Sequence, residues 1–274
     1  MIVVGKFDGV LLASDFDETL CDGMTNTVPE RSLAALRRFM AEGGRFLVAT
    51  GRAHRTFAPW ADKVPMNAPA VLSNGSAIYD FETEQMLWQS FLRPQAADDV
   101  EALCRAFPDL GFEAYHGEDI YVHNPNSVTE AHMRKVGAAY TRAPIQEMPQ
   151  PWTKIIFQQS HGYLERVQAH VLQTLGGHYE CIFSSRCLLE FTDKGSTKGQ
   201  AVLQVAGRLG IAEEHIYCTG DNPNDIPMLK CAAIPFVPGN AAPMVKEVSG
   251  ARLVCTCAEG AMADIIDILD GIYS

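Results

Sequence analysis

Apolar runs of strand length alternate with a helical segment over the first 80 residues of the chain. The runs at 10–14, 45–50 and 70–72 are short and mostly apolar, and between the first two the apolar residues recur at helical spacing. The Thr-x-x-Glu spacing of Thr27 and Glu30, with a proline in the first turn, predicts a capping box where this helix begins. The pattern predicts a βαβ unit with parallel neighbouring strands.

The pattern changes at about residue 81. From there to about residue 191, strands come in amphipathic pairs rather than as single buried runs. Such pairs are typical of an antiparallel sheet with helices on one face, so we expect an inserted α+β domain. The expected strands are 86–91, 111–115, 119–123, 154–157, 179–183 and 187–191, and the expected helices are 95–107, a segment from about 128, and 163–175.

Strand and helix alternate again after the insertion. The apolar runs 216–219, 234–237 and 252–255 are expected strands, and an amphipathic helix follows the last of them. The two outer pieces therefore predict an α/β fold, a doubly wound and mostly parallel Rossmann-like sheet that surrounds the inserted domain. We assign 1–82 and 188–274 to this core and 83–187 to the insertion.

Two carboxylates follow the first strand directly. Asp15 and Asp17 are two residues apart, so both side chains leave an extended chain on the same face. In an open parallel sheet, ligands bind beyond the carboxyl ends of the strands, which is where these side chains lie. Like charges held close together are unfavourable unless a cation or a shared proton relieves them. The pair indicates a divalent metal site, and an ordinary acidic turn is the alternative interpretation.

A second acidic turn follows a later strand. Asp221 and Asp225 come directly after the run 216–219, so two distant segments would bring four carboxylates to the same edge of the sheet. Because no His or Cys cluster accompanies them, a hard cation such as Mg²⁺ fits better than zinc. Capping of the next helix by Asp221 or Asn224 is the alternative interpretation.

A lysine stands near the start of a predicted helix. Lys198 opposes the helix dipole there by about 0.3 to 1 kcal/mol, so its position indicates a nearby anion, either a phosphate or Asp15. Lys194, in the preceding loop, is the competing candidate, and the closeness of Lys198 to the helix favours Lys198. Thr50 and Ser73, at the ends of two other strands, would add hydroxyl donors.

The composition narrows the possible partners. Lys and Arg number 22 and Asp and Glu number 33, so the formal net charge is −11. This balance argues against a nucleic-acid surface and against attraction to anionic membranes. No apolar run approaches the roughly 18 residues of a membrane span, and the eight cysteines lack a metal-ligand spacing. We expect a cytoplasmic protein in a reducing compartment, a monomer or small homo-oligomer, that binds neither nucleic acid nor membrane.

Four elements of the sequence match a family pattern in order. The motifs Asp15-x-Asp17-x-Thr19, Thr50-Gly51-Arg52, Lys198-Gly199 and Gly220-Asp221-x-x-Asn224-Asp225 closely resemble the four motifs of the haloacid dehalogenase (HAD) superfamily. Two smaller signatures, Ser73-Asn74-Gly75 and Gly239-Asn240-Ala241, and the position of the insertion resemble its Cof-like phosphatase group with a type IIB cap. The resemblance covers 10–80 and 188–270. One departure is Glu18, where these relatives usually carry glycine.

The resemblance implies a Mg²⁺-dependent phosphatase that acts on a small phosphorylated metabolite. Asp15 would be the nucleophile that becomes an aspartyl phosphate, and Asp17 the general acid and then the general base. The Asp15 carboxylate, the Asp17 carbonyl and Asp221 would hold Mg²⁺, with Asp225 beside them or bound through water. The residues expected around the phosphoryl group and the metal loop are Thr50, Gly51, Lys198 and Asn224.

The choice of substrate is left to the inserted cap domain. In the resembling group, sugar phosphates are the commonest substrates and phosphorylated cofactors come next. A phosphomutase on the same core, which returns the phosphoryl group to a sugar, and a non-catalytic phosphate-binding protein are the alternative functions. The polar cap residues that we consider for contact with the leaving group are His116, Glu118, Tyr121, His123, Lys154 and Arg186.

Overall fold

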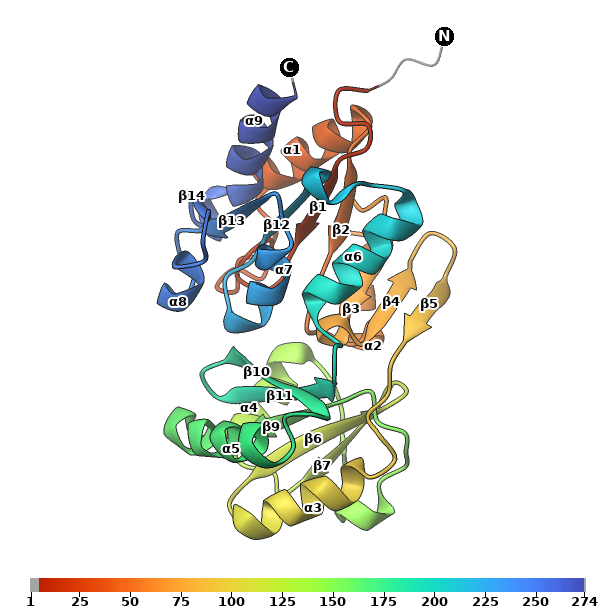
Figure 1. Ribbon diagram of the computed structural model, residues 1–274, viewed down its shortest axis with the longest axis vertical. Helices are drawn as coiled ribbons and strands as arrows, with labels where there is room; N and C mark the ends of the chain where they lie inside the picture. Colours follow the sequence, from red (N-terminus) through yellow and green to blue (C-terminus); the bar gives the residue numbers. More distant parts are fainter. Residues whose placement is uncertain (1–4, 274) are drawn as a thin grey trace.

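The computed structural model describes residues 5–273, which form two lobes (Figure 1). Within these residues, the upper lobe of the figure contains a parallel sheet of five strands in the order β14-β13-β12-β1-β2. Because β1 and β12 are parallel neighbours, the two acidic turns that follow them lie at the same edge of the sheet. The strands are β1 (Leu11–Ser14), β2 (Arg45–Val48), β12 (Ile216–Thr219), β13 (Ile234–Pro238) and β14 (Arg252–Val254).

Helices cover both faces of this parallel sheet. Leu12 of β1 packs on the face of α1 and α9, whereas Leu11 and Ala13 pack on the face of α6 and α7. Successive side chains of a strand point to opposite faces, so a strand buried on both sides reads as a continuous apolar run. The doubly wound α/β core expected from the sequence is confirmed. The helices are α1 (Glu30–Ala41), α2 (His54–Ala61), α6 (Lys198–Leu209), α7 (Ile226–Lys230), α8 (Pro243–Lys246) and α9 (Ala261–Ile272).

A small antiparallel sheet extends the core beyond β2. A single parallel bridge between Ala49 and Val71 joins it to the chain just after β2. Its strands are β3 (Ala70–Leu72), β4 (Ala77–Asp80) and β5 (Gln85–Gln89). The strand β4 and the helix α2, which contains Pro59, were not expected from the sequence.

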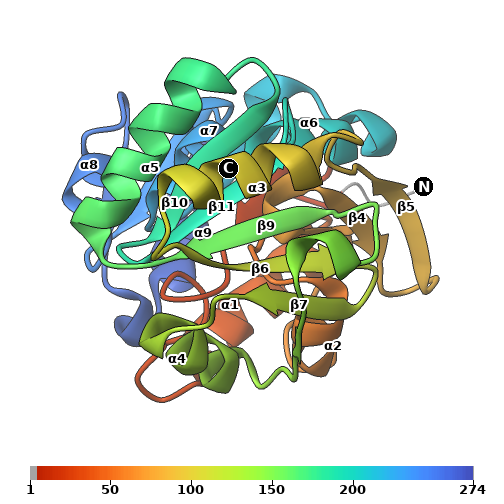
Figure 2. The same cartoon turned by 90° about the horizontal axis from the view of Figure 1, so that it is seen from below.

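The lower lobe is the inserted α+β domain. Within the described residues its sheet has the strand order β10-β11-β9-β6-β7-β8, antiparallel except for the pair β7 and β8. Figure 2 shows α3 and α5 lying across one face of this sheet. The elements are β6 (Gly111–His116), β7 (Asp119–His123), β8 (Thr141–Arg142), β9 (Lys154–Gln158), β10 (Tyr179–Ser185), β11 (Leu188–Asp193), α3 (Ala96–Ala106), α4 (Ser127–Val136) and α5 (His161–Thr174).

The expectation that helices lie on one face of the cap sheet is wrong. Phe112 and Phe157 pack with α3 and α5, but Tyr115 and Ile156 lie on the opposite face and pack with Met133 of α4. Adjacent strand residues alternate between the two faces, so both faces of the sheet are partly apolar. The face covered by α4 is the one that meets the core.

The strand pairings differ from the domain boundaries expected at 82/83 and 187/188. β5 pairs with β4 of the core, and β11 pairs with β9 and β10 of the cap. Both strands are locally amphipathic, and only their partners decide to which lobe they belong. We propose that the chain crosses between the lobes near Ser90 and Ser196, whose hydroxyl oxygens lie 2.8 Å apart.

The capping box expected at Thr27 and Glu30 is wrong. Thr27 is paired with Asp22 as an extended residue, and its hydroxyl lies 2.8 Å from that of Thr25. The helix α1 begins at Glu30 with Pro29 as its N-cap, which has no side-chain cap. Among residues 5–273, no helix combines the length and the apolar character needed to cross a membrane.

Candidate active site

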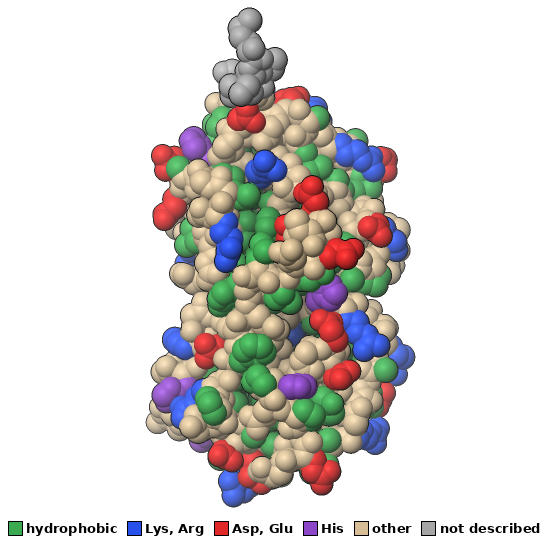
Figure 3. Space-filling view, turned by 90° about the vertical axis from the view of Figure 1, so that its right-hand side faces the viewer, with side chains coloured by type: hydrophobic (Ala, Val, Ile, Leu, Met, Phe, Trp, Pro, Cys, Tyr) green, Lys and Arg blue, Asp and Glu red, His purple; other side chains and the backbone are tan. Residues whose placement is uncertain are grey.

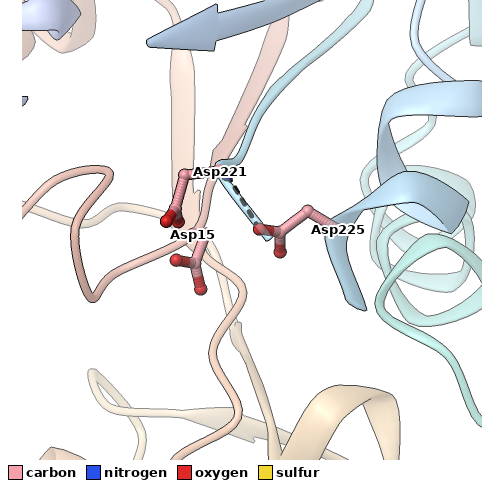
Figure 4. Close-up of side chains that lie close together, drawn as sticks. All are labelled: Asp15, Asp221 and Asp225. Atoms are coloured by element: carbon pink, nitrogen blue, oxygen red, sulfur yellow. Dashed lines mark hydrogen bonds between the residues drawn. The ribbon is translucent and has the colours of Figure 1, made fainter. Parts of the chain in front are cut away.

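Three carboxylates converge at the edge of the parallel sheet. Asp15 follows β1, and Asp221 and Asp225 follow β12 (Figure 4). All three side chains are buried, and each offers an oxygen within 4.8 Å of the others. Parallel pairing of β1 with β12 brings these residues together although about 200 positions separate them in the chain.

Lys198 lies between two of these carboxylates. It is the first residue of α6 and is 1% exposed, and its Nζ donates to Asp15 Oδ1 at 2.5 Å and to Asp225 Oδ1 at 2.6 Å. Lys194, the competing candidate, lies at the surface and pairs with Glu180 at 3.1 Å. The cation near the start of α6 is therefore held by carboxylates, which explains its position against the helix dipole.

The loop after β12 fixes the second and third carboxylates. Asp225 Oδ2 accepts hydrogen bonds from the backbone N–H groups of Asp221 and Asn222, at 2.9 and 3.0 Å. Asp221 accepts from the hydroxyl of Thr19 at 2.8 Å. Both oxygens of Asp225 are thus in use, one with Lys198 and one with backbone amides. The second oxygen of Asp221 accepts from the side-chain amide of Asn222 at 2.8 Å, so each of its oxygens has one partner, and Asp15 has a hydrogen bond on one oxygen, from Lys198. Asp15 therefore keeps the most lone pairs free for a ligand and Asp225 the fewest.

Three carboxylates buried this close together are electrostatically unfavourable unless positive charge balances them. Burial and the neighbouring Asp225 raise the pKa of Asp15 to about 7, although Lys198 acts in the opposite direction. Burial, followed by the charges of Asp15 and Asp225, raises the pKa of Asp221 well above its usual range. One lysine does not balance three buried carboxylates, so the oxygen donors fit a hard divalent cation.

Asp17 lies apart from the group of three carboxylates. Its two oxygens accept from Nε and Nη2 of Arg52, at 2.8 and 2.7 Å. Burial raises the pKa of Asp17, but the hydrogen bonds and charge of Arg52 outweigh it and the pKa lies below its usual value. The guanidinium also lies over the ring of Phe16, at 5.1 Å from its centre. The side chain of Asp17 is therefore a stable carboxylate in this structure.

The loop after β2 provides the remaining expected residues. Thr50 is buried, and its hydroxyl accepts from the backbone N–H of Arg52 at 3.1 Å. The carbonyl of Gly51 accepts from Lys154 of the cap at 2.7 Å. Asn224 donates to the side-chain oxygen of Asn74 at 3.0 Å. The backbone N–H of Asn74 also donates to the carbonyl of Thr50 at 3.0 Å, so the loops after β2, β3 and β12 are connected at the same edge of the sheet.

A cavity of about 370 Å³ lies between the two lobes. Asp15, Asp17, Gly51 and Asn224 line it. Four further expected site residues are buried and do not line it: Thr50, Lys198, Asp221 and Asp225. Figure 3 shows how the molecule narrows between the lobes, where charged and histidine side chains gather on one side. A small molecule in the cavity would therefore meet the first two aspartates directly.

Of the six polar cap residues considered for the leaving group, Lys154 is the one that lines this cavity. His116 contacts the carbonyl of Pro151, and Glu118 accepts from the backbone N–H of Arg55 in the core. His123 stacks on Phe112. Tyr121 packs beside the apolar cluster of the cap, and Arg186 is exposed.

Several residues at the cavity were not predicted from the sequence. Arg52 belongs to a predicted motif, but its ion pair with Asp17 was not predicted. From the cap, α4 contributes His132 and Lys135, and β10 contributes Ser184. The residues of α4 at the cavity recur every three to four positions, so they lie on one face of the helix expected from about 128. This spacing was visible in the sequence. Nothing in the sequence indicated that this face of the helix meets the core.

Comparison with known proteins identifies the family. A model of haloacid dehalogenase-like hydrolases matches residues 12–265. The HMP-PP phosphatase of Cronobacter sakazakii is 27% identical over 274 residues, covering 96% of this chain and 94% of that protein. The pyridoxal phosphate phosphatase of Escherichia coli (strain K12) is 24% identical over 251 residues, 86% of this chain and 90% of that protein. A solved HAD subclass IIB sugar phosphatase has a TM-score of 0.84 at 20% identity, covering 95% of this chain and 99% of its own. This chain belongs to the haloacid dehalogenase-like hydrolase family and has the fold of subclass IIB.

Proposed function

We propose that this protein is a Mg²⁺-dependent phosphatase that hydrolyses a small phosphomonoester through a phosphorylated aspartate. The observation that carries the proposal is the position of Asp15. Its carboxylate lies at the end of β1, lines the cavity, and is held by Lys198 at 2.5 Å. The relatives named HMP-PP phosphatase and pyridoxal phosphate phosphatase support a phosphorylated metabolite as the substrate class.

In the first step, a carboxylate oxygen of Asp15 attacks phosphorus, the bond from phosphorus to the leaving oxygen breaks, and Asp17 gives its proton to that oxygen. In the second step, Asp17 takes a proton from water, whose oxygen attacks phosphorus and releases Asp15 and phosphate. The ion pair with Arg52 favours the carboxylate form of Asp17. The carboxylate is the form that can take a proton from water, so the ion pair favours the second step. The first step requires a protonated Asp17, so we infer that this ion pair loosens when substrate enters.

Asp15, Asp221 and the carbonyl of Asp17 would hold Mg²⁺, with Asp225 beside them. The donor set supports this assignment because it consists of oxygens and carries more negative charge than Lys198 balances. The bound cation would stabilise charge that develops on the phosphoryl oxygens. The residues of this chain that would position the phosphoryl group are Lys198, Thr50, Gly51 and Asn224. Lys198 would also offset the negative charge of the phosphoryl oxygens.

A panel of phosphomonoesters tests the proposed function. The purified protein is assayed for release of free phosphate with Mg²⁺ and with a chelator that removes it. We expect hydrolysis that depends on Mg²⁺. Release of phosphate also distinguishes hydrolysis from phosphomutase action, which returns the phosphoryl group to the sugar.

Two lysine variants control the panel. Lys198→Ala removes the buried cation beside Asp15, whereas Lys194→Ala removes a surface lysine four positions earlier. We expect the first to lose at least about a hundredfold in kcat/KM, as removal of one electrostatic stabiliser typically does, and the second to retain activity. Equal activity of the two variants, or hydrolysis that is unchanged by the chelator, would contradict the proposed roles.

A further inference from the structure

The turn Ser73–Gly75, between β3 and β4, has an unfavourable backbone conformation. The angle φ is +50° at Ser73 and +55° at Asn74, and Gly75 continues the left-handed run at +97°. Residues that carry a Cβ atom rarely adopt this region, and here two of them follow each other. Both are buried, with 5% and 6% of their surfaces exposed. Backbone strain of this kind persists where the surrounding structure holds it, and it is concentrated at functional sites.

The turn is bound to the loop after β2. The backbone N–H of Ser73 donates to the carbonyl of Arg52 at 2.9 Å, and the N–H of Asn74 donates to the carbonyl of Thr50 at 3.0 Å. These two carbonyls flank Gly51, which lines the cavity. Within the part of the chain that the structure describes, the N–H of Gly51 has no hydrogen-bond partner. The turn therefore holds the chain on both sides of an unpaired donor at the cavity.

The same turn also contacts the loop after β12 and the start of α6. The Oδ1 atom of Asn74 accepts from Nδ2 of Asn224 at 3.0 Å. The amide of Asn74 lies against Gly51, where a Cβ atom would fall 3.2 Å from its Nδ2. Gly75 packs against the residue that precedes α6, because a Cβ atom on Gly75 would fall 2.2 Å from the carbonyl oxygen of Thr197. The turn thus meets all three segments that carry the proposed phosphoryl-binding residues.

The contact between the two asparagines leaves buried polar atoms without partners. Among residues 5–273, Asn74 Nδ2 and Asn224 Oδ1 make no hydrogen bond. Buried amide atoms without partners lower the stability of a fold, and so does a left-handed backbone at a residue other than glycine. Stability alone therefore does not explain why a buried asparagine occupies position 74.

We propose that the turn Ser73–Gly75 positions the residues that bind the phosphoryl group, and that Asn74 is a positioning residue that acts through Asn224. This role rests on the proposed phosphatase activity and adds a residue to its site. The side chain of Asn74 holds the amide of Asn224 beside Gly51, so that these two residues keep a fixed spacing at the cavity. Tight connections between antiparallel strands also use left-handed residues, so a turn that only joins β3 to β4 is the alternative.

Two substitutions of asparagine by glycine separate these interpretations. Asn74→Gly keeps the left-handed turn accessible and removes the side chain. Asn26→Gly is the matched control, because Asn26 has φ at +53°, is exposed and does not line the cavity. With Mg²⁺ and a phosphomonoester that the wild type hydrolyses, we expect Asn74→Gly to lower kcat/KM about tenfold and Asn26→Gly to leave it unchanged. Equal kcat/KM in the two variants overturns the role of Asn74.

A second variant covers the case in which Asn74→Gly does not fold. Asn74→Ser fills more of the same space, but its hydroxyl oxygen is one bond closer to the backbone than Oδ1 and does not reach Asn224 in the same way. We expect a loss of kcat/KM in the same direction. Wild-type kcat/KM in Asn74→Ser overturns the role of the contact with Asn224.

Binding of inorganic phosphate tests the positioning without turnover. Titration calorimetry in the presence of Mg²⁺ gives the dissociation constant, which we expect to rise about tenfold in Asn74→Gly and to stay unchanged in Asn26→Gly. A wild type that binds phosphate but hydrolyses no phosphomonoester overturns the proposed function, and this comparison then decides the role of Asn74 alone. An unchanged dissociation constant in Asn74→Gly, or a wild type without affinity for phosphate, overturns the positioning role.

A double-mutant cycle tests whether Asn74 acts through Asn224. Asn224→Ala removes the amide that Asn74 holds, so Asn74→Gly should then lower kcat/KM by less than about twofold further. The same tenfold loss in the wild type and in Asn224→Ala overturns the action through Asn224.

Discussion

Glu18 holds a left-handed backbone conformation, with φ at +64°, directly after Asp17. Glycine is the residue that adopts this region without strain. Two contacts hold the backbone: the N–H of Glu18 donates to the carbonyl of Cys21 at 2.9 Å, and its carbonyl accepts from Asn240 at 2.7 Å. The side chain lies against Gly23, where a Cβ atom would fall 1.7 Å from the carboxylate. The turn beside Asp17 is thus held by its surroundings against the preference of its own residue.

Comparison of Glu18→Gly with Glu18→Ala isolates the strain at this residue, because both variants lose the side chain. We expect the glycine variant to be more stable by about 1 kcal/mol, which corresponds to about 2 °C or more in Tm for a chain of this size. Thermal unfolding followed by circular dichroism measures the difference. An alanine variant with an equal or higher Tm would show that the left-handed conformation costs nothing here.

At the scale of elements, β9 of the cap is tied to the loop after β2 of the core. Lys154 of β9 is 2% exposed, and it contacts the carbonyl of Gly51, the carboxylate of Glu190 on β11, and the ring of Tyr115 at 4.6 Å from its centre. A lysine this deeply buried requires such partners. The contact to Gly51 joins the cap to the loop that we expect to bind phosphate.

We expect Lys154→Met to lower the free energy of unfolding by about 3 kcal/mol, because Glu190 then stays buried without its cation. The double variant with Glu190→Leu should recover much of this loss, since an apolar pair leaves no unpaired charge. Thermal unfolding of the wild type, the two single variants and the double variant measures the coupling. Purely additive losses would contradict a direct interaction between the two side chains.

At the scale of the whole molecule, we expect binding of Mg²⁺ to be coupled to the stability of the fold. The site joins loops from both halves of the core, which are brought together only by folding. In the metal-free protein, burial and Asp225 raise the pKa of Asp15 from 3.8 to about 7. Between these two values the folded state binds more protons than the unfolded state, so this group makes the metal-free protein less stable as pH rises. Mg²⁺ requires the deprotonated carboxylate and removes this penalty.

The increase in Tm caused by millimolar Mg²⁺ should therefore be larger at about pH 8 than at about pH 6. Thermal unfolding with and without the cation at the two pH values measures it. Asp221→Asn is the control, because it removes a proposed ligand and should reduce the increase at both pH values. An equal or smaller effect of Mg²⁺ at the higher pH would contradict the proposed ligand set.

The sequence predicted the parts of this molecule that local patterns determine. Buried parallel strands read as apolar runs, and the polar residues at their ends follow from the fold, so Asp15 and Asp221 were placed at one edge. Contacts between distant segments were not predictable: the pairing of Arg52 with Asp17 within the core and the approach of His132 of the cap to the cavity depend on how those segments pack. The boundaries of the cap are hard to predict for the same reason, since the sequences of β5 and β11 do not reveal which strands they pair with.

The measurement that most directly tests the proposed function is the identification of the residue that carries phosphate during turnover. The protein is mixed with substrate and Mg²⁺ and quenched in acid, and the acyl phosphate is reduced with borohydride, which converts a phosphorylated aspartate to homoserine. Peptide mass spectrometry then locates the modified residue. We expect homoserine at position 15, and no modification in Asp15→Asn, which should also lose turnover. Turnover without modification of Asp15, or phosphatase activity retained by Asp15→Asn, would contradict its role as the nucleophile.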